Sequence, residues 1–237
     1  MRVAWKTDKG RKKSVNEDAV FVDEESGLFL LADGTSAPRA GRVASRLAVR
    51  KAYAFLKERL TKAPNDEILP LLNQAIAHAH EAVRETSLKS RALSGMGTTL
   101  IVLYIKADSA YLSHVGDSRA YRHRERLELI TTDHTQEYGL DQDVMIRQFF
   151  FYSKTRVLSQ ALGPSKAVVC DSHRVALRPG DIILLCSDGL TDMLSDGAIE
   201  ELIVNYGEDI EKASTLLVEA ANRMGGKDNI SLVLIGW

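Results

Sequence analysis

Acidic residues stand at five points where an apolar, strand-like run ends or a tight turn begins. They are Asp18 in VNEDAVF, Asp33 in LADGT, Asp117 in HVGDSRAY, Asp188 in CSDGL and Asp228 in GGKDNISL, and three of them adjoin a glycine. A lone Asp-Gly pair is typical of a turn. If the strands instead bring these carboxylates together, repulsion raises their pKa values, and hard divalent cations such as Mg²⁺ or Mn²⁺ remove the conflict. The pattern alone leaves both arrangements open: one shared metal site, or five separate turns.

Side chains suited to other chemistries are few. The two cysteines, Cys170 and Cys186, lie in apolar runs, where they are typical core residues rather than parts of a disulfide framework. Neither lies in an exposed cationic loop of the kind that activates a thiol. His78 and His80 stand two apart on an expected helix, so they do not share a face, and we expect both at the surface. A zinc site, which would need cysteines or paired histidines, is therefore not indicated.

Composition and charge narrow the class of protein. The chain has 237 residues, 45% hydrophobic and 27% charged, which is ordinary for a globular protein. Its formal net charge of −1 provides no overall field for nucleic acid or an acidic membrane, so neither is expected as a partner. No run approaches the roughly 18 apolar residues of a membrane span. The start, MRVAWKTDKGRKK, lacks the apolar region of a secretion signal, so we expect a cytoplasmic location.

The hydrophobic pattern indicates which elements carry the aspartates. Apolar residues at helical spacing predict helices over 41–60, 66–87, about 191–205 and 208–223. The strands between the helix pairs are joined by short turns, so they are expected to be antiparallel. The order of elements favours an α+β sandwich over a doubly wound parallel fold. The predicted strands lie within 18–34 (two strands), 98–107, 109–115, 118–124, 127–131, 167–170, 173–177, 181–187 and 229–237.

Seven motifs follow one another along the chain: NEDA, LADGTSAPRAG, SGMGTTL, HVGDSRAY, LSQALG, CSDGLTD and KDNISLVL. In these motifs the chain resembles the metal-dependent serine/threonine protein phosphatases of type 2C (PPM), and among them the compact bacterial branch. The resemblance runs from Gly10 to Leu234. It implies a four-layer αββα sandwich, with two antiparallel sheets flanked by helix pairs, which agrees with the order of elements above. We expect one catalytic domain over residues 1–237.

The resemblance also implies a site for two metal ions, Mg²⁺ or Mn²⁺, at one edge of the sheets. Asp33 would bridge the two ions, and the backbone carbonyl of Gly34 would contact the second of them. Asp188 and Asp228 would complete the first metal site. Asp18 would lie beside the second metal, directly or through water.

Bacterial relatives carry a third, weaker metal on the aspartates of the GDSR and SDG motifs. Here these residues are Asp117 and Asp188, with Asp192 as a helper further out. The implied reaction is hydrolysis of phosphoserine and phosphothreonine in proteins by a metal-activated water, with no phosphoenzyme. The runner-up is a catalytically weak relative that acts as a phosphopeptide-binding regulatory module. The expected partners are phosphoproteins and a cognate Ser/Thr kinase, and the expected state is a monomer.

Two positions depart from the family's pattern. Where the family has a phosphate-binding Arg, five residues before the Asp of NED, this chain has Lys13. We predict that Lys13 binds the substrate phosphate and is catalytic together with Asp33 and Asp18. Arg11 is an alternative, and a solvated basic loop is another. Thr35 stands where animal relatives place a His proposed as general acid, a task that a metal-bound water would take over.

The segment 134–157 matches the place of the family's mobile flap, but it is short and aromatic. Its residues Phe149–Tyr152 either pack on the sheet or grip a peptide or partner protein. His114 and His134 lie within family-like motifs, and we expect them to pack or hydrogen-bond rather than to catalyse.

Overall fold

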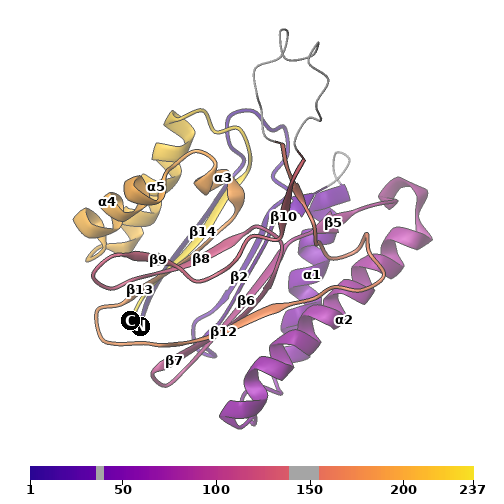
Figure 1. The fold of residues 1–237 in the computed structure, drawn as a ribbon, viewed down its shortest axis with the longest axis horizontal. Helices are drawn as coiled ribbons and strands as arrows, with labels where there is room; N and C mark the ends of the chain where they lie inside the picture. The colour runs from indigo at the N-terminus through magenta and orange to yellow at the C-terminus, as the bar shows by residue number, and fades with distance from the viewer. Residues whose placement is uncertain (36–39, 139–154) are drawn as a thin grey trace.

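Two antiparallel β-sheets lie face to face in the middle of the protein, and helices cover both outer sides (Figure 1). The structure is a computed structural model that describes residues 1–35, 40–138 and 155–237. Every strand pairing within the two large sheets is antiparallel. The predicted α+β fold with four layers is confirmed.

The first sheet holds the C-terminal strand near its middle. This strand pairs with the N-terminal strand on one side, where Arg2 lies opposite Gly236, and with a third strand on the other side. In spatial order the sheet consists of β1 (Arg2–Asp8), β14 (Ile230–Gly236), β13 (Ile182–Cys186), β8 (Arg119–His123) and β9 (Leu127–Leu129).

Two of the four strand pairings in the second sheet are hairpins between strands that follow each other in the chain. In spatial order it consists of β12 (Asp171–Ala176), β7 (Ser109–Val115), β6 (Leu100–Lys106), β3 (Leu28–Ala32) and β2 (Ala19–Asp23). The two strands predicted around the Glu-Ser-Gly turn are β2 and β3.

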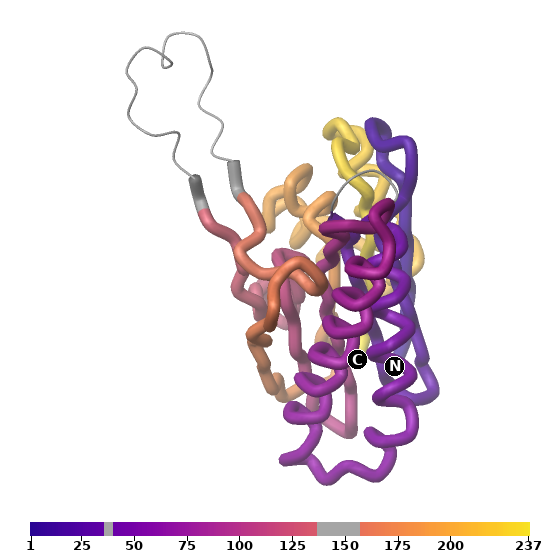
Figure 2. The backbone as a smooth tube through the Cα atoms, turned by 90° about the vertical axis from the view of Figure 1, so that its right-hand side faces the viewer, coloured from indigo at the N-terminus to yellow at the C-terminus, as the bar shows by residue number. Residues whose placement is uncertain are grey.

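Helices pack on the outer face of each sheet. α1 (Ala40–Leu56) and α2 (Ile68–Lys89) lie side by side over the second sheet, as Figure 2 shows. α4 (Asp196–Tyr206) and α5 (Ile210–Arg223) cover the first sheet. The short helices are α3 (Asp188–Thr191), η1 (Asn65–Glu67) and η2 (Arg91–Leu93).

Three apolar layers fill the spaces between these four layers. In β3, Leu28 and Leu30 face α1 and α2, whereas Phe29 and Leu31 face the other sheet. The same alternation holds in β13, where successive side chains point to opposite faces of the strand. Because both faces of these strands are buried, they read as continuous apolar runs.

The helix predicted over 191–205 begins later than expected. The Ser195 hydroxyl accepts a hydrogen bond of 3.3 Å from the Ala198 amide and caps α4 at its N-terminus. The residues before the cap form the separate short turn α3, which starts at Asp188.

Two further expectations about local structure are wrong. Residues 167–170 do not form a strand, because the Val169 amide donates to the side chain of Gln160 at 2.8 Å instead of to a neighbouring strand. His80 is buried, with only 2% of its surface exposed, because it follows Ile76 by one helical turn on the core-facing stripe of α2. Its Nδ1 accepts a hydrogen bond from the Gly163 amide at 3.1 Å.

Part of the predicted flap forms a two-stranded ribbon, β10 (Thr135–Tyr138) paired with β11 (Thr155–Leu158). The aromatic residues Phe149–Tyr152 lie outside the described residues. A second small pair, β4 (Gly34–Thr35) with β5 (Gly97–Thr98), follows directly after Asp33.

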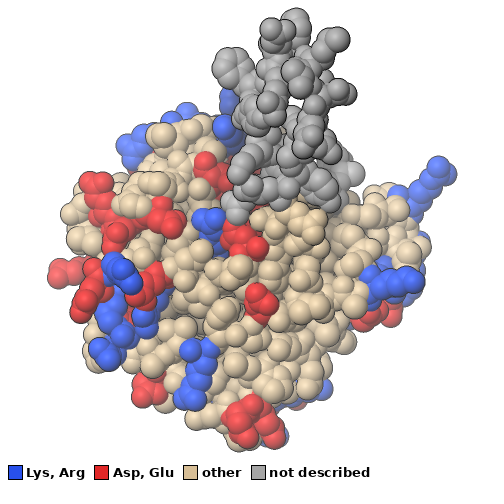
Figure 3. Space-filling view, in the orientation of Figure 1, with Lys and Arg blue, Asp and Glu red and all other residues tan. Residues whose placement is uncertain are grey.

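On the face drawn in Figure 3, acidic and basic side chains are interspersed over the visible described residues, as expected from the net charge of −1. Within residues 1–35, 40–138 and 155–237, no helix combines the length and apolar character needed to cross a membrane.

Candidate active site

The five aspartates singled out in the sequence converge at one end of the two sheets. This is the end marked by α3, β5 and β10 in Figure 1. Asp33 follows β3, Asp188 follows β13 and Asp228 precedes β14. Together with Asp117 they line a cavity of about 590 Å³. Asp18 is 6% exposed and does not line this cavity, although its charge acts on Asp33.

The backbone of Asp33 is held by two threonines at the start of β6. The Asp33 amide donates to Thr99 Oγ1 at 2.9 Å, and its carbonyl accepts from the Thr98 hydroxyl at 2.8 Å and the Thr99 amide at 2.9 Å. Thr99 Oγ1 also lies 2.8 Å from Ser118 Oγ, beside Asp117. These contacts join the loops that carry two of the acidic residues.

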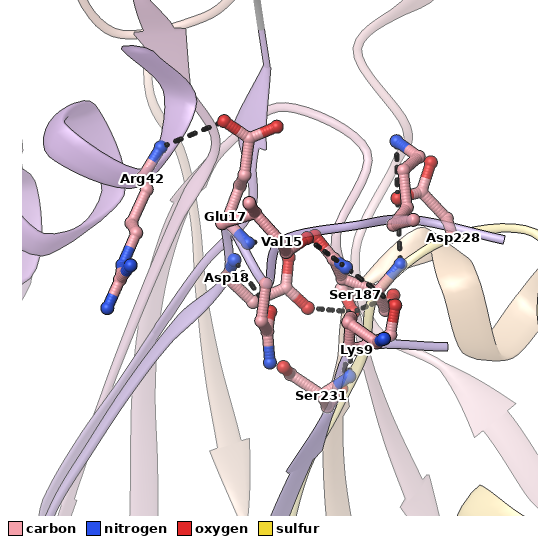
Figure 4. Close-up of polar contacts among 11 residues, drawn as sticks. Lys9, Val15, Glu17, Asp18, Arg42, Ser187, Asp228 and Ser231 are labelled. Carbon is pink, nitrogen blue, oxygen red and sulfur yellow. Dashed lines mark hydrogen bonds and ion pairs between the residues drawn. The ribbon is translucent and has the colours of Figure 1, made fainter. Parts of the chain in front are cut away.

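Asp18 is held by a chain of two serines. The Ser187 hydroxyl donates to Asp18 Oδ2 at 2.9 Å and accepts from the Ser231 amide at 3.0 Å. Figure 4 shows Asp18 and Ser187 pointing toward each other between the strands. Ser187 directly precedes Asp188, so one serine links two of the candidate ligands.

Asn229 is a buried residue, 2% exposed, that ties the loop containing Lys13 to the start of β14. Its Oδ1 accepts from the Glu17 amide at 2.8 Å. Its Nδ2 donates to the carbonyls of Lys9 at 2.9 Å and Val15 at 3.0 Å (Figure 4). The amides of Arg11 and Lys12 also donate to the Gly226 carbonyl, so Asn229 helps to position the loop that carries Lys13 without lining the cavity.

Replacing Asn229 by alanine is expected to lower the free energy of unfolding by about 2–4 kcal/mol, because buried hydrogen-bond partners lose their contacts. The change is measured by urea denaturation. Asn65→Ala, at an exposed position of η1, is the matched control and should shift stability by less than about 0.5 kcal/mol. If both substitutions lowered the free energy of unfolding equally, the proposed positioning role of Asn229 would be wrong.

Two glycines let the loops around the cavity approach closely. A Cβ atom on Gly189 would lie 1.9 Å from the carbonyl oxygen of Asn229. A Cβ atom on Gly34 would lie 2.3 Å from the carbonyl oxygen of Gly41, at the start of α1. Gly34, which follows Asp33, and Gly189, which follows Asp188, are therefore needed for close packing of the loops as well as for a turn.

The electrostatics of the cluster favour bound cations. Burial, with the nearby charges of Asp18 and Asp188, raises the pKa of Asp33 well above its ordinary value. Burial followed by the charge of Asp117 raises the pKa of Asp188 to about 7, and burial raises that of Asp18 to about 6. Asp18 Oδ1 and Asp188 Oδ1 are buried without a hydrogen-bond donor. Oxygen atoms in this condition fit hard divalent cations such as Mg²⁺ and Mn²⁺.

Lys13 lines the cavity and forms an ion pair with Asp228, with Nζ 2.7 Å from Oδ1. Burial lowers the pKa of Lys13, but the hydrogen bond and charge of Asp228 outweigh that effect and leave the pKa raised. Lys13 is therefore positioned to present a positive charge to an anion in the cavity. Arg11, the alternative to Lys13 as the phosphate-binding residue, lines a separate groove with Asn222 and not this cavity.

His114 and His134 form a hydrogen-bonded support beside this cavity, in agreement with the expectation from sequence. The Gly116 amide donates to His134 Nδ1 at 3.2 Å, and His114 Nε2 lies 3.0 Å from the Thr132 carbonyl. The two rings stack, with centroids 4.9 Å apart and planes at 22°. Asp171 lies close to both, but one ion cannot lie in the planes of two stacked imidazoles, so this group does not fit a metal site.

Several positioning residues were missed in the sequence: Thr98, Thr99, Ser187 and Asn229. They stand within the motifs GTTL, CSDG and KDN, directly beside strands or candidate ligands. Adjacency to an aspartate was a signal for Ser187 and Asn229, whereas Thr98 and Thr99 had only their place in a motif, because the partners of these residues lie far away in the chain.

Comparison with known proteins agrees with this geometry. The family model described as protein phosphatase 2C matches residues 7–223. The serine/threonine phosphatase stp of Listeria monocytogenes is 32% identical over 241 residues, which cover 99% of this chain and 95% of that protein.

Solved structures show the same similarity. The crystal structure of the Mycobacterium tuberculosis serine/threonine phosphatase PstP/Ppp superposes with a TM-score of 0.83 at 31% identity, covering 98% of this chain and 97% of that one. The catalytic domain of PstP in complex with two manganese ions gives a TM-score of 0.79 at 32% identity, covering 98% and 96%. The family match and the identity over nearly the whole chain show that this chain belongs to the protein phosphatase 2C family.

Proposed function

We propose that this chain hydrolyses phosphoserine and phosphothreonine esters of proteins at a centre that holds two divalent cations. The observation that carries the proposal is the convergence of Asp33, Asp117, Asp188 and Asp228 on one cavity, with buried carboxylate oxygens that lack donors. A regulatory module that only binds phosphopeptides would not need all four of these carboxylates in one cavity. Release of inorganic phosphate from a phosphothreonine peptide is the direct test.

The roles of the proposed ligands are those that the family resemblance implies, and the place of Asp33, Gly34, Asp188 and Asp228 on the cavity lining supports them. Asp33 would bridge the two ions, Asp188 and Asp228 would serve the first, and the Gly34 carbonyl would serve the second. Asp18 would support the second metal site without lining the cavity, since it is buried and accepts a hydrogen bond from Ser187. Bound cations would lower the pKa of a water molecule and offset the charge of the phosphoryl oxygens, so neither a serine nor a cysteine nucleophile is needed.

The chain's own residues orient the site and attract the phosphate. Thr98 and Thr99 hold the backbone of Asp33, and Ser187 holds the carboxylate of Asp18. Lys13 brings a positive charge to the cavity. These groups are fixed before substrate binds, so binding requires little rearrangement of them.

Finer features of the site belong to the same proposal. A weaker third cation would use Asp117 and Asp188, supported by the place of both residues on the lining of the cavity. Both Mg²⁺ and Mn²⁺ suit an all-oxygen ligand set. The cognate kinase, the monomeric state, the cytoplasmic location, and the single domain of residues 1–237 with its flap stay predictions.

Replacing Lys13 by alanine is expected to raise KM for p-nitrophenyl phosphate about 10- to 100-fold, because one charge-assisted contact to the dianion is lost. Lys13→Arg should restore most of the affinity, since guanidinium groups bind phosphate well. Lys12→Ala is the control and should leave KM unchanged. If Lys13→Ala instead lowers kcat alone, the main role of Lys13 is to hold Asp228.

A further inference from the structure

A second large groove lies along α1, on the side of that helix toward the loop between β1 and β2. Its volume is about 840 Å³. Three arginines spaced four residues apart line it, which places them on one face of the helix. Between them lies an apolar floor. The arginines are Arg42, Arg46 and Arg50, and the floor is Val15, Val43 and Leu47.

Among the described residues, the side chains of the three arginines lack acidic partners. Some other arginines are paired, for example Arg119 with Asp133 at 2.8 Å and Arg124 with Asp181 at 2.7 Å. Across the described residues, no guanidinium group of Arg42, Arg46 or Arg50 forms an ion pair, and all three residues are exposed. Like charges four residues apart on a helix repel each other. The stripe is thus electrostatically unsatisfied and complementary to a negatively charged partner.

The groove begins where the catalytic cavity ends. The Arg42 amide donates to Glu17 Oε1 at 3.3 Å (Figure 4). Glu17 also lines the cavity. Val15 lies on the same loop as Lys13, two residues further on. A chain that places a phosphorylated residue in the cavity can therefore continue along α1.

We propose that this groove binds an acidic segment of the phosphoprotein substrate next to the phosphorylated residue. The inference rests on the proposed phosphatase function and specifies its substrate class. Arg42 to Arg50 spans about 12 Å at 1.5 Å per helical residue, the length of about four residues of an extended chain. Acidic side chains within about four positions of the phosphoresidue match the arginines, and an apolar side chain between them covers the floor.

The test compares phosphothreonine peptides that carry three glutamates on the N-terminal side, three on the C-terminal side, or glutamines at both. We expect the unaltered protein to hydrolyse one of the acidic peptides at least about tenfold better in kcat/KM than the glutamine peptide. The double variant R46E/R50E should abolish this preference. Hydrolysis of p-nitrophenyl phosphate should stay unchanged, because neither arginine lines the catalytic cavity.

The matched control is K57E/K62E, which changes the net charge by the same amount at exposed positions just beyond α1. It should keep the preference for the acidic peptide. Added NaCl at about 0.5 M should weaken that preference in the unaltered protein and leave R46E/R50E unaffected, because salt screens exposed charges. An equal loss in both double variants would show a general effect of charge and overturn the proposal.

Other occupants give different results. If R46E/R50E changes the mass measured by sedimentation, the groove binds a second copy of the chain and the proposal fails. The proposal also fails if no peptide preference exists and only the unaltered protein cosediments with phosphatidylserine vesicles, because the groove then binds a membrane. Equal rates on acidic and glutamine peptides also overturn it, while leaving phosphatase activity intact. If no substrate is hydrolysed, the proposed function fails, and fluorescence anisotropy of the labelled acidic peptides still decides whether the arginines bind them.

Discussion

Replacing Asp33 by asparagine is expected to reduce kcat/KM for p-nitrophenyl phosphate by at least about a thousandfold, because the side chain proposed to serve both cations loses its charge. Asparagine keeps the shape of the side chain, so the contacts of the Asp33 backbone with Thr98 and Thr99 remain. Initial rates with saturating Mn²⁺ measure the effect. Asp66→Asn, at an exposed position of η1, is the control and should retain full activity.

Thermal unfolding distinguishes a loss of catalysis from a loss of folding in Asp33→Asn. Burial and neighbouring carboxylates disfavour the charged form of Asp33, so in chelator the asparagine variant should melt at the same temperature as the unaltered protein or higher. Mn²⁺ should raise Tm in the unaltered protein, since a ligand at 100 times its Kd contributes about 2.7 kcal/mol. That increase should shrink in Asp33→Asn. Near-normal turnover by the variant would place the catalytic centre elsewhere.

Removal of divalent cations is expected to lower the rate with p-nitrophenyl phosphate at least about a hundredfold, because the proposed reaction depends on a water molecule activated by bound cations. Addition of Mn²⁺ or Mg²⁺ in excess of the chelator should restore the rate. Ca²⁺ should restore less, because its longer and more variable bonds hold reacting oxygens less strictly.

Circular dichroism in chelator provides the control for the cation experiment. The three apolar layers do not depend on the carboxylates, so the far-ultraviolet spectrum should be unchanged. Full activity after complete removal of metal, verified by elemental analysis, would rule out a mechanism based on two cations.

Much of the fold could be predicted because local patterns agree with the global arrangement. The runs around Leu28 and Leu184 are apolar on both faces, and each must end where the chain leaves the layers, at Asp33 and Asp188. Strands of antiparallel sheets end at either rim, so the meeting of these carboxylates at one rim follows from the topology, and the pattern alone leaves it open. The roles of these residues as ligands were implied by the family resemblance and stay predictions.

The remaining features depend on contacts that no local pattern contains. Asn229 bonds to the carbonyls of Lys9 and Val15, more than 200 residues away along the chain, and its own surroundings read as a turn. His80 is buried because of its place on the core stripe of α2, although polar character favours exposure. Val169 forms no strand because a side chain takes up its amide.

The place of β14 between β1 and β13 has a consequence for biosynthesis. Arg2 of β1 and Gly236 of β14 are partners, so β1 has no neighbour in its sheet until β14 has been translated. Until then β13 also presents an open edge, which is prone to pair with other chains. Such distant pairing makes folding slow. Because Asp228 lies two residues before Ile230, the first residue of β14, a nascent chain that has not reached this region lacks both the strand and part of the cavity wall, so the proposed site is complete only after Asp228 and β14 have been translated.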